Sequence, residues 1–392
     1  MDSLYLALRY LAFNKLRTAT LVICVTLIAI LPLALQVLLA ESERQLLARA
    51  GSTPLLLGAR GSALDLAMNA LYFADETPEL ISMAADEAIA TSGLAMPIPL
   101  YVRFQARRFP IVGTTLDYFG FRGLRIAQGR QLALLGECVI GADVAERLGI
   151  GVGDSLLSSP EALFDLAGVY PLKMQVVGVL ARAHSADDRA VFVDLKTAWV
   201  VQGLVHGHED VTRGEDSSVI IDRTQDNVVA SARLVEYTEI TADNIDSFHF
   251  HGSPDSYPLS AMIVVPNDDK AGTLLRGRYL GSEPPYQLAV PKTVIEGLLA
   301  TIFRIKEVLD AVILIVAVAT VLALVLVFAL SLRLRQREIQ TVFHIGGRRS
   351  TIARLLAAEI VIILLAAALL CALGITVMQP FSDELVRVLF IA

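Results

Sequence analysis

Long stretches without a charged residue stand out in the pattern of hydrophobic and polar positions. Residues 18–40 form one such run, residues 311–332 a second and residues 360–378 a third. A bilayer core needs about 20 apolar residues in a helix, so each run is long enough to cross a membrane. No uncharged run between residues 41 and 294 reaches this length. The pattern predicts a membrane protein with α-helical transmembrane segments, three of them visible, and one large domain inserted after the first.

The residues before the first run indicate how the chain is oriented. Residues 1–17 carry Arg9, Lys15 and Arg17, and positive charge before a span places the N-terminus in the cytoplasm. We expect residues 1–17 to form a cytoplasmic or interfacial helix; the alternative is that the first span begins earlier. A cleaved signal peptide has an apolar core of only about 7–15 residues, so residues 18–40 are interpreted as a retained transmembrane helix.

Residues 41–294 have the mixed pattern of a folded domain outside the membrane. Short runs of alternating or continuous apolar residues are typical of strands. Strands are predicted at 98–104, 108–113, 174–180, 190–193, 218–221, 231–238 and 261–265, and helices at 63–73, 141–149 and 196–203. Strands with intervening helices predict an α+β domain.

A second pattern precedes and enters the second apolar run. Apolar residues alternate spacings of three and four at Ile295, Leu298, Ile302, Ile305, Leu309, Val312 and Val316. This is the a/d stripe of a helix that packs lengthwise on another helix. One helix over residues 295–332 would be about 55 Å long at ~1.5 Å per residue, and much of it would stand clear of the bilayer as a stalk. The alternative is that the stripe packs on its own domain.

Residues 333–354 form a basic segment between the second and third spans. It contains Arg333, Arg335, Arg337, Arg348, Arg349 and Arg354 against the single acidic residue Glu338. This charge places the segment in the cytoplasm, in agreement with the orientation from the N-terminus. The pair Gly346-Gly347 allows the chain to reverse. Glu359 lies at the cytoplasmic edge of the third span, residues 355–378, where a carboxylate reaches water or pairs with an arginine.

Composition and missing motifs exclude several classes of protein. The 392 residues are 55% hydrophobic, which fits a few spanning helices plus one large domain. The net charge of −7 is not typical of nucleic-acid-binding proteins, which are basic. The chain has neither a Walker A sequence nor a Gly-Xaa-Ser-Xaa-Gly elbow. We therefore assign no catalytic residue and no cofactor, and expect any ATP hydrolysis to occur in another polypeptide.

Four histidines form two short clusters, at His206, His208, His249 and His251. Four imidazoles brought together would bind a transition metal. Nothing in the sequence brings the two clusters together, however, and the alternative is a solvated acidic loop and an ordinary strand. They are weak metal candidates only.

Several short motifs occur in an order that resembles one protein family. Near the ends they are Asn14-Lys15-Leu16-Arg17-Thr18, Arg337-Glu338-Ile339-Gln340-Thr341-Val342, Ile345-Gly346-Gly347-Arg348-Arg349 and Ala358-Glu359. Between them lie Val112-Gly113-Thr114-Thr115, Asp117-Tyr118-Phe119, Gly129-Arg130, Val139-Ile140-Gly141 and Val177-Gly178-Val179. Together they resemble the permease subunits of the MacB/FtsX/LolC group of ABC transporters, the type VII or mechanotransmission family.

The resemblance implies a permease that works with a cytoplasmic ABC ATPase dimer, which would bind the ATP and magnesium, and with a second permease copy or paralogue. A periplasmic adaptor or substrate-binding protein is a further possible partner. Residues 41–294 would be a periplasmic MacB-like core domain in a bacterial inner membrane protein. The family has four spanning helices, so residues 379–392 are expected to be a periplasmic segment leading to a fourth.

The resemblance also implies sites. We expect the ATPase to contact Arg335, Arg337, Glu338, Gly346, Gly347, Arg348 and Glu359; the alternative is that the arginines only set topology. The stalk dimer seam would be Ile295, Leu298, Ile302, Ile305 and Leu309.

Three functional hypotheses follow from this reading. The first is ATP-driven export, efflux or extraction of lipoproteins or lipids. The second is an ATP-driven regulator of a periplasmic partner, such as a cell-wall hydrolase, with no transported cargo. The third is a sensor or adhesin that is merely anchored, and the basic segment at residues 333–354 argues against it because an anchor needs no docking element.

Overall fold

The computed structural model describes residues 2–159, 171–207, 220–224, 227–230, 238–250, 252–281, 285–334, 336, 340, 344 and 349–390. The chain divides into two compact units. The helical unit comprises Met1–Gln45 and Leu299–Ala392, and the sheet unit comprises Leu46–Leu298.

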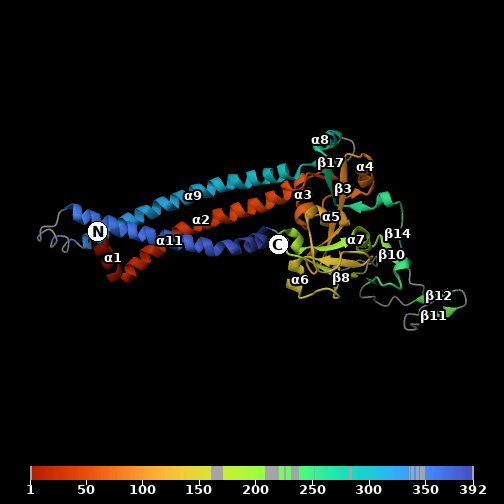
Figure 1. Ribbon diagram of the computed structural model, residues 1–392, viewed down its shortest axis with the longest axis horizontal. Coiled ribbons are helices and arrows are strands. Elements are labelled where there is room, and N and C mark those ends of the chain that lie inside the picture. The colour runs from red at the N-terminus through yellow and green to blue at the C-terminus, as the bar shows by residue number, and fades with distance from the viewer. Residues whose placement is uncertain are drawn as a thin grey trace. The chain divides into compact units, whose positions relative to one another are not determined.

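The helical unit is built from a short helix and parts of three long ones (Figure 1). They are α1 (Asp2–Phe13), α2 (Lys15–Gly51), α9 (Pro291–Leu334) and α11 (Arg349–Phe390). Among the described residues, two segments are long and apolar enough to cross a membrane, Lys15–Leu38 and Ala353–Met378. They correspond to the first and third predicted spans. The second predicted span falls within α9, which is continuous, and it stays a prediction.

Small side chains let α2 and α11 approach closely inside the helical unit. On α11, Ile363, Ala367 and Cys371 are buried at four-residue intervals, which is one face of a helix. The Cys371 Sγ lies 3.5 Å from the carbonyl oxygen of Thr26 on α2. A Cβ added at Gly374 would overlap the side chain of Ile30. Close backbone approach at small residues is how helices pack within a membrane.

Helix α1 is a separate element that packs on α11. Ala7 and Leu11 on α1 are buried, and Leu11 joins a cluster with Leu21 and Ile363. The chain bends at Asn14, between α1 and α2. Residues 2–40 therefore do not form one continuous helix, while the interfacial position of α1 and the start of the first span stay predictions.

The long helices do not end where the uncharged runs end. Helix α2 continues past residue 40 to Gly51, and α9 begins at Pro291. Helix α11 begins at Arg349, inside the segment expected to be a loop, and continues past residue 378 to Phe390. An uncharged run marks only the part of a helix suited to lipid. Charged residues such as Glu41 and Glu43 favour helix as well as apolar ones do, so the helix continues beyond it.

The sheet unit contains an 11-stranded sheet. Its strands are β1 (Leu55–Ala59), β3 (Ala95–Ala106), β4 (Phe109–Thr114), β5 (Ile126–Gly129), β6 (Glu137–Ile140), β7 (Ser155–Leu157), β8 (Leu172–Leu180), β9 (Val191–Asp194), β13 (Thr238–Glu239), β16 (Ala261–Pro266) and β17 (Tyr286–Ala289). The order is β13-β8-β6-β9-β4-β3-β16-β1-β17, with β5 and β7 also paired to β8. Parallel pairs (β4 with β9, β6 with β8, β8 with β13) occur among antiparallel ones, so the sheet is mixed.

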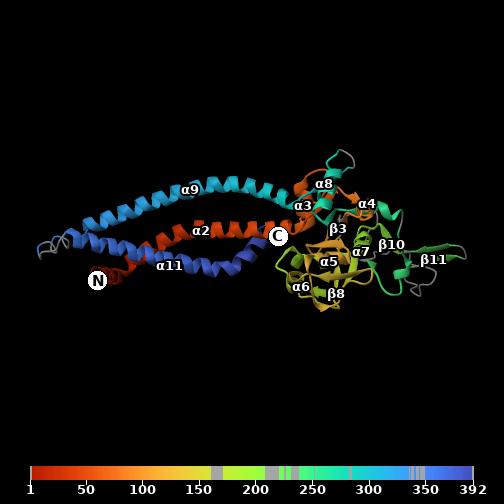
Figure 2. The ribbon, with the colours of Figure 1, turned by 45° about the horizontal axis from the view of Figure 1, so that its top comes forward.

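Three two-stranded sheets and several short helices complete the unit. The sheets are β2 (Ile81–Ser82) with β15 (Pro258–Leu259), β10 (Val205–Gly207) with β14 (Phe248–Phe250), and β11 (Ile220–Thr224) with β12 (Asn227–Ala230). The helices are α3 (Ala63–Tyr72), α4 (Ala84–Thr91), α5 (Leu116–Arg122), α6 (Ala142–Leu148), α7 (Leu195–Val201) and α8 (Asp269–Arg278), with 3-10 turns η1 (Ala186–Arg189), η2 (Ile245–Ser247) and η3 (Pro254–Ser256). Within this unit, β11 and α3 lie at opposite ends (Figure 2).

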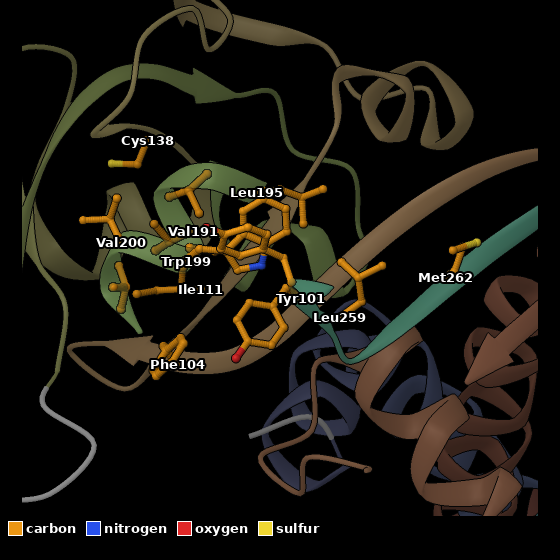
Figure 3. Packing of buried hydrophobic residues seen from close by; sticks show 14 of the residues in the cluster. Tyr101, Phe104, Ile111, Cys138, Val191, Leu195, Trp199, Val200, Leu259 and Met262 are labelled. Carbon is orange, nitrogen blue, oxygen red and sulfur yellow. The ribbon is translucent and has the colours of Figure 1, made fainter. Parts of the chain in front are cut away.

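The core of the sheet unit is formed by side chains from the central strands and α7. Figure 3 shows Trp199 of α7 among Tyr101, Ile111 and Val191 from the sheet. The Trp199 indole lies 4.7 Å from the Tyr257 ring, centroid to centroid, and its Nε1 donates to the carbonyl of Pro258. Trp199 is the single tryptophan of the chain, so its fluorescence reports on this core alone.

Most elements predicted for this unit are present. The predicted helix at 63–73 is α3, and Ser62 caps it by accepting from the Asp65 N–H. The predicted helix at 196–203 is α7, and the strands predicted at 98–104 and 174–180 lie within β3 and β8. The α+β prediction is confirmed. Of the strand predicted at 231–238, residues 231–237 lie outside the described residues.

Candidate functional site at the end of α2

The two connections between the sheet unit and the long helices are neighbouring strands. Strand β1 follows α2 after a few residues, and β17 leads into α9. The two strands pair antiparallel, with Leu56 opposite Ala289 and Leu57 opposite Leu288. The chain therefore enters and leaves the sheet unit at one edge of the sheet, joined by a ladder of backbone hydrogen bonds.

The last turn of α2 is held in the sheet unit by a buried arginine. Arg49 Nη1 donates to Asp187 Oδ2 at 2.6 Å, and Nη2 donates to Asp187 Oδ1 at 3.0 Å, which is a bidentate pair. The side chains of Arg49 and Asp187 are only 8% and 2% exposed. Arg49 also donates from Nε to the carbonyl of Leu71 and lies over the Phe73 ring. The guanidinium is thus bound on its edges and on a face.

Asp187 accepts hydrogen bonds from Arg49 on α2, from Tyr118 on α5 and from Ser185, which caps η1. Tyr118 on α5 donates its hydroxyl to Oδ1 at 2.7 Å and accepts from Arg49 Nη2 at 2.9 Å. Ser185 donates to Oδ2 at 2.8 Å. A buried charge is tolerated only when it is paired and hydrogen-bonded in this way. We call Arg49, Tyr118, Ser185 and Asp187 the α2 anchor.

The charges of the anchor keep each other ionised. Burial raises the pKa of the Asp187 carboxyl, but the charge of Arg49 and the hydrogen bonds outweigh it and hold the pKa at about 2. Burial lowers the pKa of Arg49, and the attraction of Asp187 more than offsets this, so the net pKa lies above its ordinary value. Both groups are therefore charged at any physiological pH.

A second set of contacts closes the C-terminal end of α2. Tyr72 on α3 donates to the carbonyl of Leu46 at 2.5 Å. Arg122 on α5 donates to the hydroxyls of Ser52 and Thr53, which themselves donate to the Arg49 carbonyl. A positive charge at a helix C-terminus is favourable because the last carbonyls carry partial negative charge. Burial and the nearby Arg49 lower the pKa of Arg122.

Turn η1, which carries Asp187, is positioned by a capping box and a glycine. Ser185 and Asp188 satisfy each other's backbone N–H groups at its N-terminus. Gly141, just before α6, lies so close that an added Cβ would overlap the carbonyl oxygens of Asp187 and Asp188. Gly141 N–H also donates to the carbonyl of Ala190 at 2.9 Å. Only glycine fits this approach of two backbones.

Most of the predicted ATPase-contact residues lie outside the described residues. These are Arg335, Arg337, Glu338, Gly346, Gly347 and Arg348. Glu359 is described: it lies on α11 and is only 3% exposed within the single chain. Its burial argues for a structural role inside the helical unit, and its contact with an ATPase stays a prediction.

The predicted stalk residues all fall on α9. Ile295 is already fully buried within the single chain, and Leu298 is half-buried. Ile302, Ile305 and Leu309 continue along the same helix. Burial of Ile295 inside one chain favours the alternative at that position, which is packing on its own domain. The dimer seam as a whole stays a prediction.

The histidine clusters are closer than the sequence could indicate. Strands β10 and β14 pair antiparallel, and His206 stands opposite His249 in their register. His208 and His251 lie outside the described residues. The pairing brings one residue of each cluster together, but among the described residues no group of three or more His, Cys, Asp or Glu could hold a metal ion, so the four histidines stay weak candidates.

Comparison with known proteins agrees with this architecture. The family model described as the MacB-like periplasmic core domain matches residues 19–244, more than half of the 392 residues. The chain belongs to this family. MacB-like proteins are permease components of ABC-type transporters, and this family implies membrane localisation and association with a cytoplasmic ABC ATPase. The resemblance drawn from its motifs is confirmed.

Two solved structures resemble the MacB-like chain more weakly. The periplasmic region of MacB from Actinobacillus actinomycetemcomitans is 10% identical, with 63% of this chain and 92% of that one covered and a TM-score of 0.33. The extracellular domain of the noncanonic ABC-type transporter YknZ from Gram-positive bacteria is 12% identical, with 60% and 98% covered and a TM-score of 0.33. At these scores neither adds to the assignment. No curated protein sequence matches the chain significantly.

Sequence reasoning missed the α2 anchor of this MacB-like chain. Asp187 stands 138 residues from Arg49, and the run Asp187-Asp188-Arg189 has the composition of an ordinary turn. It is a turn, η1, but one with a buried carboxylate. One signal was present: Tyr118 and Gly141 both lie in motifs that carried the family resemblance.

Proposed function

We propose that this chain is the membrane subunit of an ATP-driven complex that transmits ATPase motion across a bacterial inner membrane to a periplasmic domain. In this proposal the N-terminus and residues 333–354 are cytoplasmic, and the sheet unit is periplasmic. A dimer of ABC ATPases binds ATP and magnesium and contacts residues 335–350. A second permease copy or a paralogue completes the complex, and the motion serves export, efflux or the extraction of lipoproteins or lipids.

The single observation that carries this proposal is the way α2 ends. One continuous helix, Lys15–Gly51, contains an apolar segment long enough to span a membrane and ends in the buried α2 anchor. A flexible tether would suffice to hold a domain at a membrane. A helix whose last turn is fixed by a buried ion pair passes displacement into the domain instead, since packed interiors are not continuously deformable.

The proposal is tested by topology and by partner capture. Full-length variants with Gly346→Cys or Glu76→Cys are treated in intact cells with a membrane-impermeant maleimide, with the parent chain as background for its native cysteines. Labelling at position 76 after outer-membrane permeabilisation, and at position 346 only after lysis, is expected. Affinity purification of the full chain is expected to recover an ABC ATPase. Equal access to both positions from one side, or no ATPase, contradicts the proposal.

A further inference from the structure

The turn between β3 and β4 carries two arginines in an unfavourable backbone conformation. Arg107 and Arg108 are the two residues of this hairpin turn, with φ angles of 49° and 72°. Two-residue hairpins with positive φ at both positions strongly prefer Asn-Gly, because side chains with a Cβ are strained there. Because the two arginines destabilise the turn, we looked for a role of their side chains.

Nothing in the described part of the chain uses these side chains. Both arginines are exposed, and neither makes a hydrogen bond or ion pair with any described residue. Asp75, the acidic residue bound to this hairpin, accepts from Gln105 at 2.6 Å instead. Arg103, on the same hairpin, is also exposed and lies over the Phe104 ring. A chain with a net charge of −7 thus presents a concentrated positive tip.

The register places this tip far from both connections to the long helices. Leu55, the first residue of β1, pairs with Val264, which pairs with Pro97 on β3. From Pro97, β3 continues to Ala106, about 30 Å farther at ~3.3 Å per residue. Strand β17 ends beside the start of β1. Helices α2 and α9 therefore join the sheet at the other end of these strands.

We propose that the β3–β4 hairpin tip is a docking site for an acidic segment of another protein, bound through the guanidinium groups of Arg107 and Arg108. Arginine matches carboxylates with two parallel hydrogen bonds, so a pair of arginines selects a segment with adjacent Asp or Glu residues. The turn places both side chains at the tip of the hairpin. This inference does not depend on the ATPase partner.

The test measures binding of a fluorescein-labelled poly-glutamate peptide to the full chain in detergent, by anisotropy at low and high salt. Arg107→Gln with Arg108→Gln is expected to weaken binding on the order of tenfold, and Lys at both positions to weaken it less, because lysine keeps the charge but lacks the paired hydrogen bonds. The matched control is Arg276→Gln with Arg278→Gln, two exposed arginines on α8. This control removes the same amount of positive charge from another part of the sheet unit. Like the test variant, it leaves the basic segment at residues 333–354 unchanged.

A second variant separates docking from a structural role. Arg107→Asn with Arg108→Gly is expected to raise the urea midpoint of Trp199 fluorescence, because the strain is relieved, and to weaken peptide binding as the Gln pair does. A lower midpoint, or equal loss of binding in the Arg276 and Arg278 control, overturns the proposal. The proposal is also overturned if the Gln variant loses binding to vesicles containing phosphatidylglycerol but keeps its binding to the peptide, because the partner would then be a lipid.

Discussion

Arg49 and Asp187 are buried together, so each charge depends on the other for its solvation. Replacing water around a carboxylate costs several kcal/mol, and the bidentate pair, Tyr118 and Ser185 offset that cost. Removing one partner leaves the other as an uncompensated buried charge. The anchor therefore contributes little as an isolated ion pair, yet makes the end of α2 intolerant of change.

Asp187→Asn and Arg49→Met are each expected to destabilise the sheet unit by about 3–5 kcal/mol, the range for breaking a buried pair. The measurement is urea unfolding of the full chain in detergent, followed by the fluorescence of Trp199. Arg44→Met is the matched control, because Arg44 lies on the same helix but is 75% exposed in its pair with Glu41. Surface pairs contribute at most about 1 kcal/mol. A smaller loss for Asp187→Asn than for Arg44→Met would contradict the anchor.

Acid is expected to weaken the same site in a defined range. The folded pKa of Asp187 is about 2, below its ordinary value of 3.8. A depressed pKa gives stability that is complete above the unfolded value and is lost as pH falls through the folded value. Between about pH 4 and pH 2 this one group should lose roughly 2 kcal/mol. Unfolding at a series of pH values measures it, and Asp187→Asn should lack that increment; identical pH curves would refute the assignment.

Local patterns could not have identified these residues. Arg49 reads as an ordinary polar residue after a span, and Asp187 as a turn residue, because nothing local records their partner. Ser62 and Trp199 show the opposite case. Ser62 caps α3 through a neighbour three residues away, and Trp199 lies in an apolar helix, so local rules found both elements. What sequence could not supply is the long-range pairing of polar groups.

At the scale of elements, periodicity located strands and helices well where one face is buried. Strand β3 and helix α7 were predicted because their apolar positions follow the period of the element. Strand β17 has only partly buried residues, and it was missed. The uncharged runs predict membrane spans and not helix ends, so they could not locate the ends of α2 and α11. Pairing of β1 with β17, which defines the candidate site, has no local signal at all.

Contact between α6 and η1 offers a test at this scale. Gly141→Ala is expected to destabilise the sheet unit by about 1–3 kcal/mol, since the new methyl group must displace the carbonyls of Asp187 and Asp188. Gly120→Ala is the control, because Gly120 lies in α5 with open space around it. There alanine should be neutral or stabilising by up to about 1 kcal/mol. Equal shifts of the urea midpoint in both variants would rule out the close approach of Gly141 to η1.

For the whole molecule, the arrangement of the connections matters more than any single contact. The anchored end of α2 leads to β1, and β1 is hydrogen-bonded to β17, which leads to α9. The ends of the two helices are thus connected through two adjacent hydrogen-bonded strands. In the proposed function, this shared edge is where motion generated at the cytoplasmic side would enter the periplasmic domain.

The last prediction concerns the cytoplasmic end of that path. In the reconstituted complex with its ATPase, Arg337→Glu is expected to reduce permease-stimulated ATP hydrolysis by on the order of tenfold, because a charged contact becomes repulsive. Arg333→Glu is the control: it makes the same charge change in the same segment, but it is not a predicted contact. If the arginines only set topology, the two variants should behave alike. If Arg337→Glu assembles with the ATPase and turns over normally, residues 335–350 are not the coupling surface.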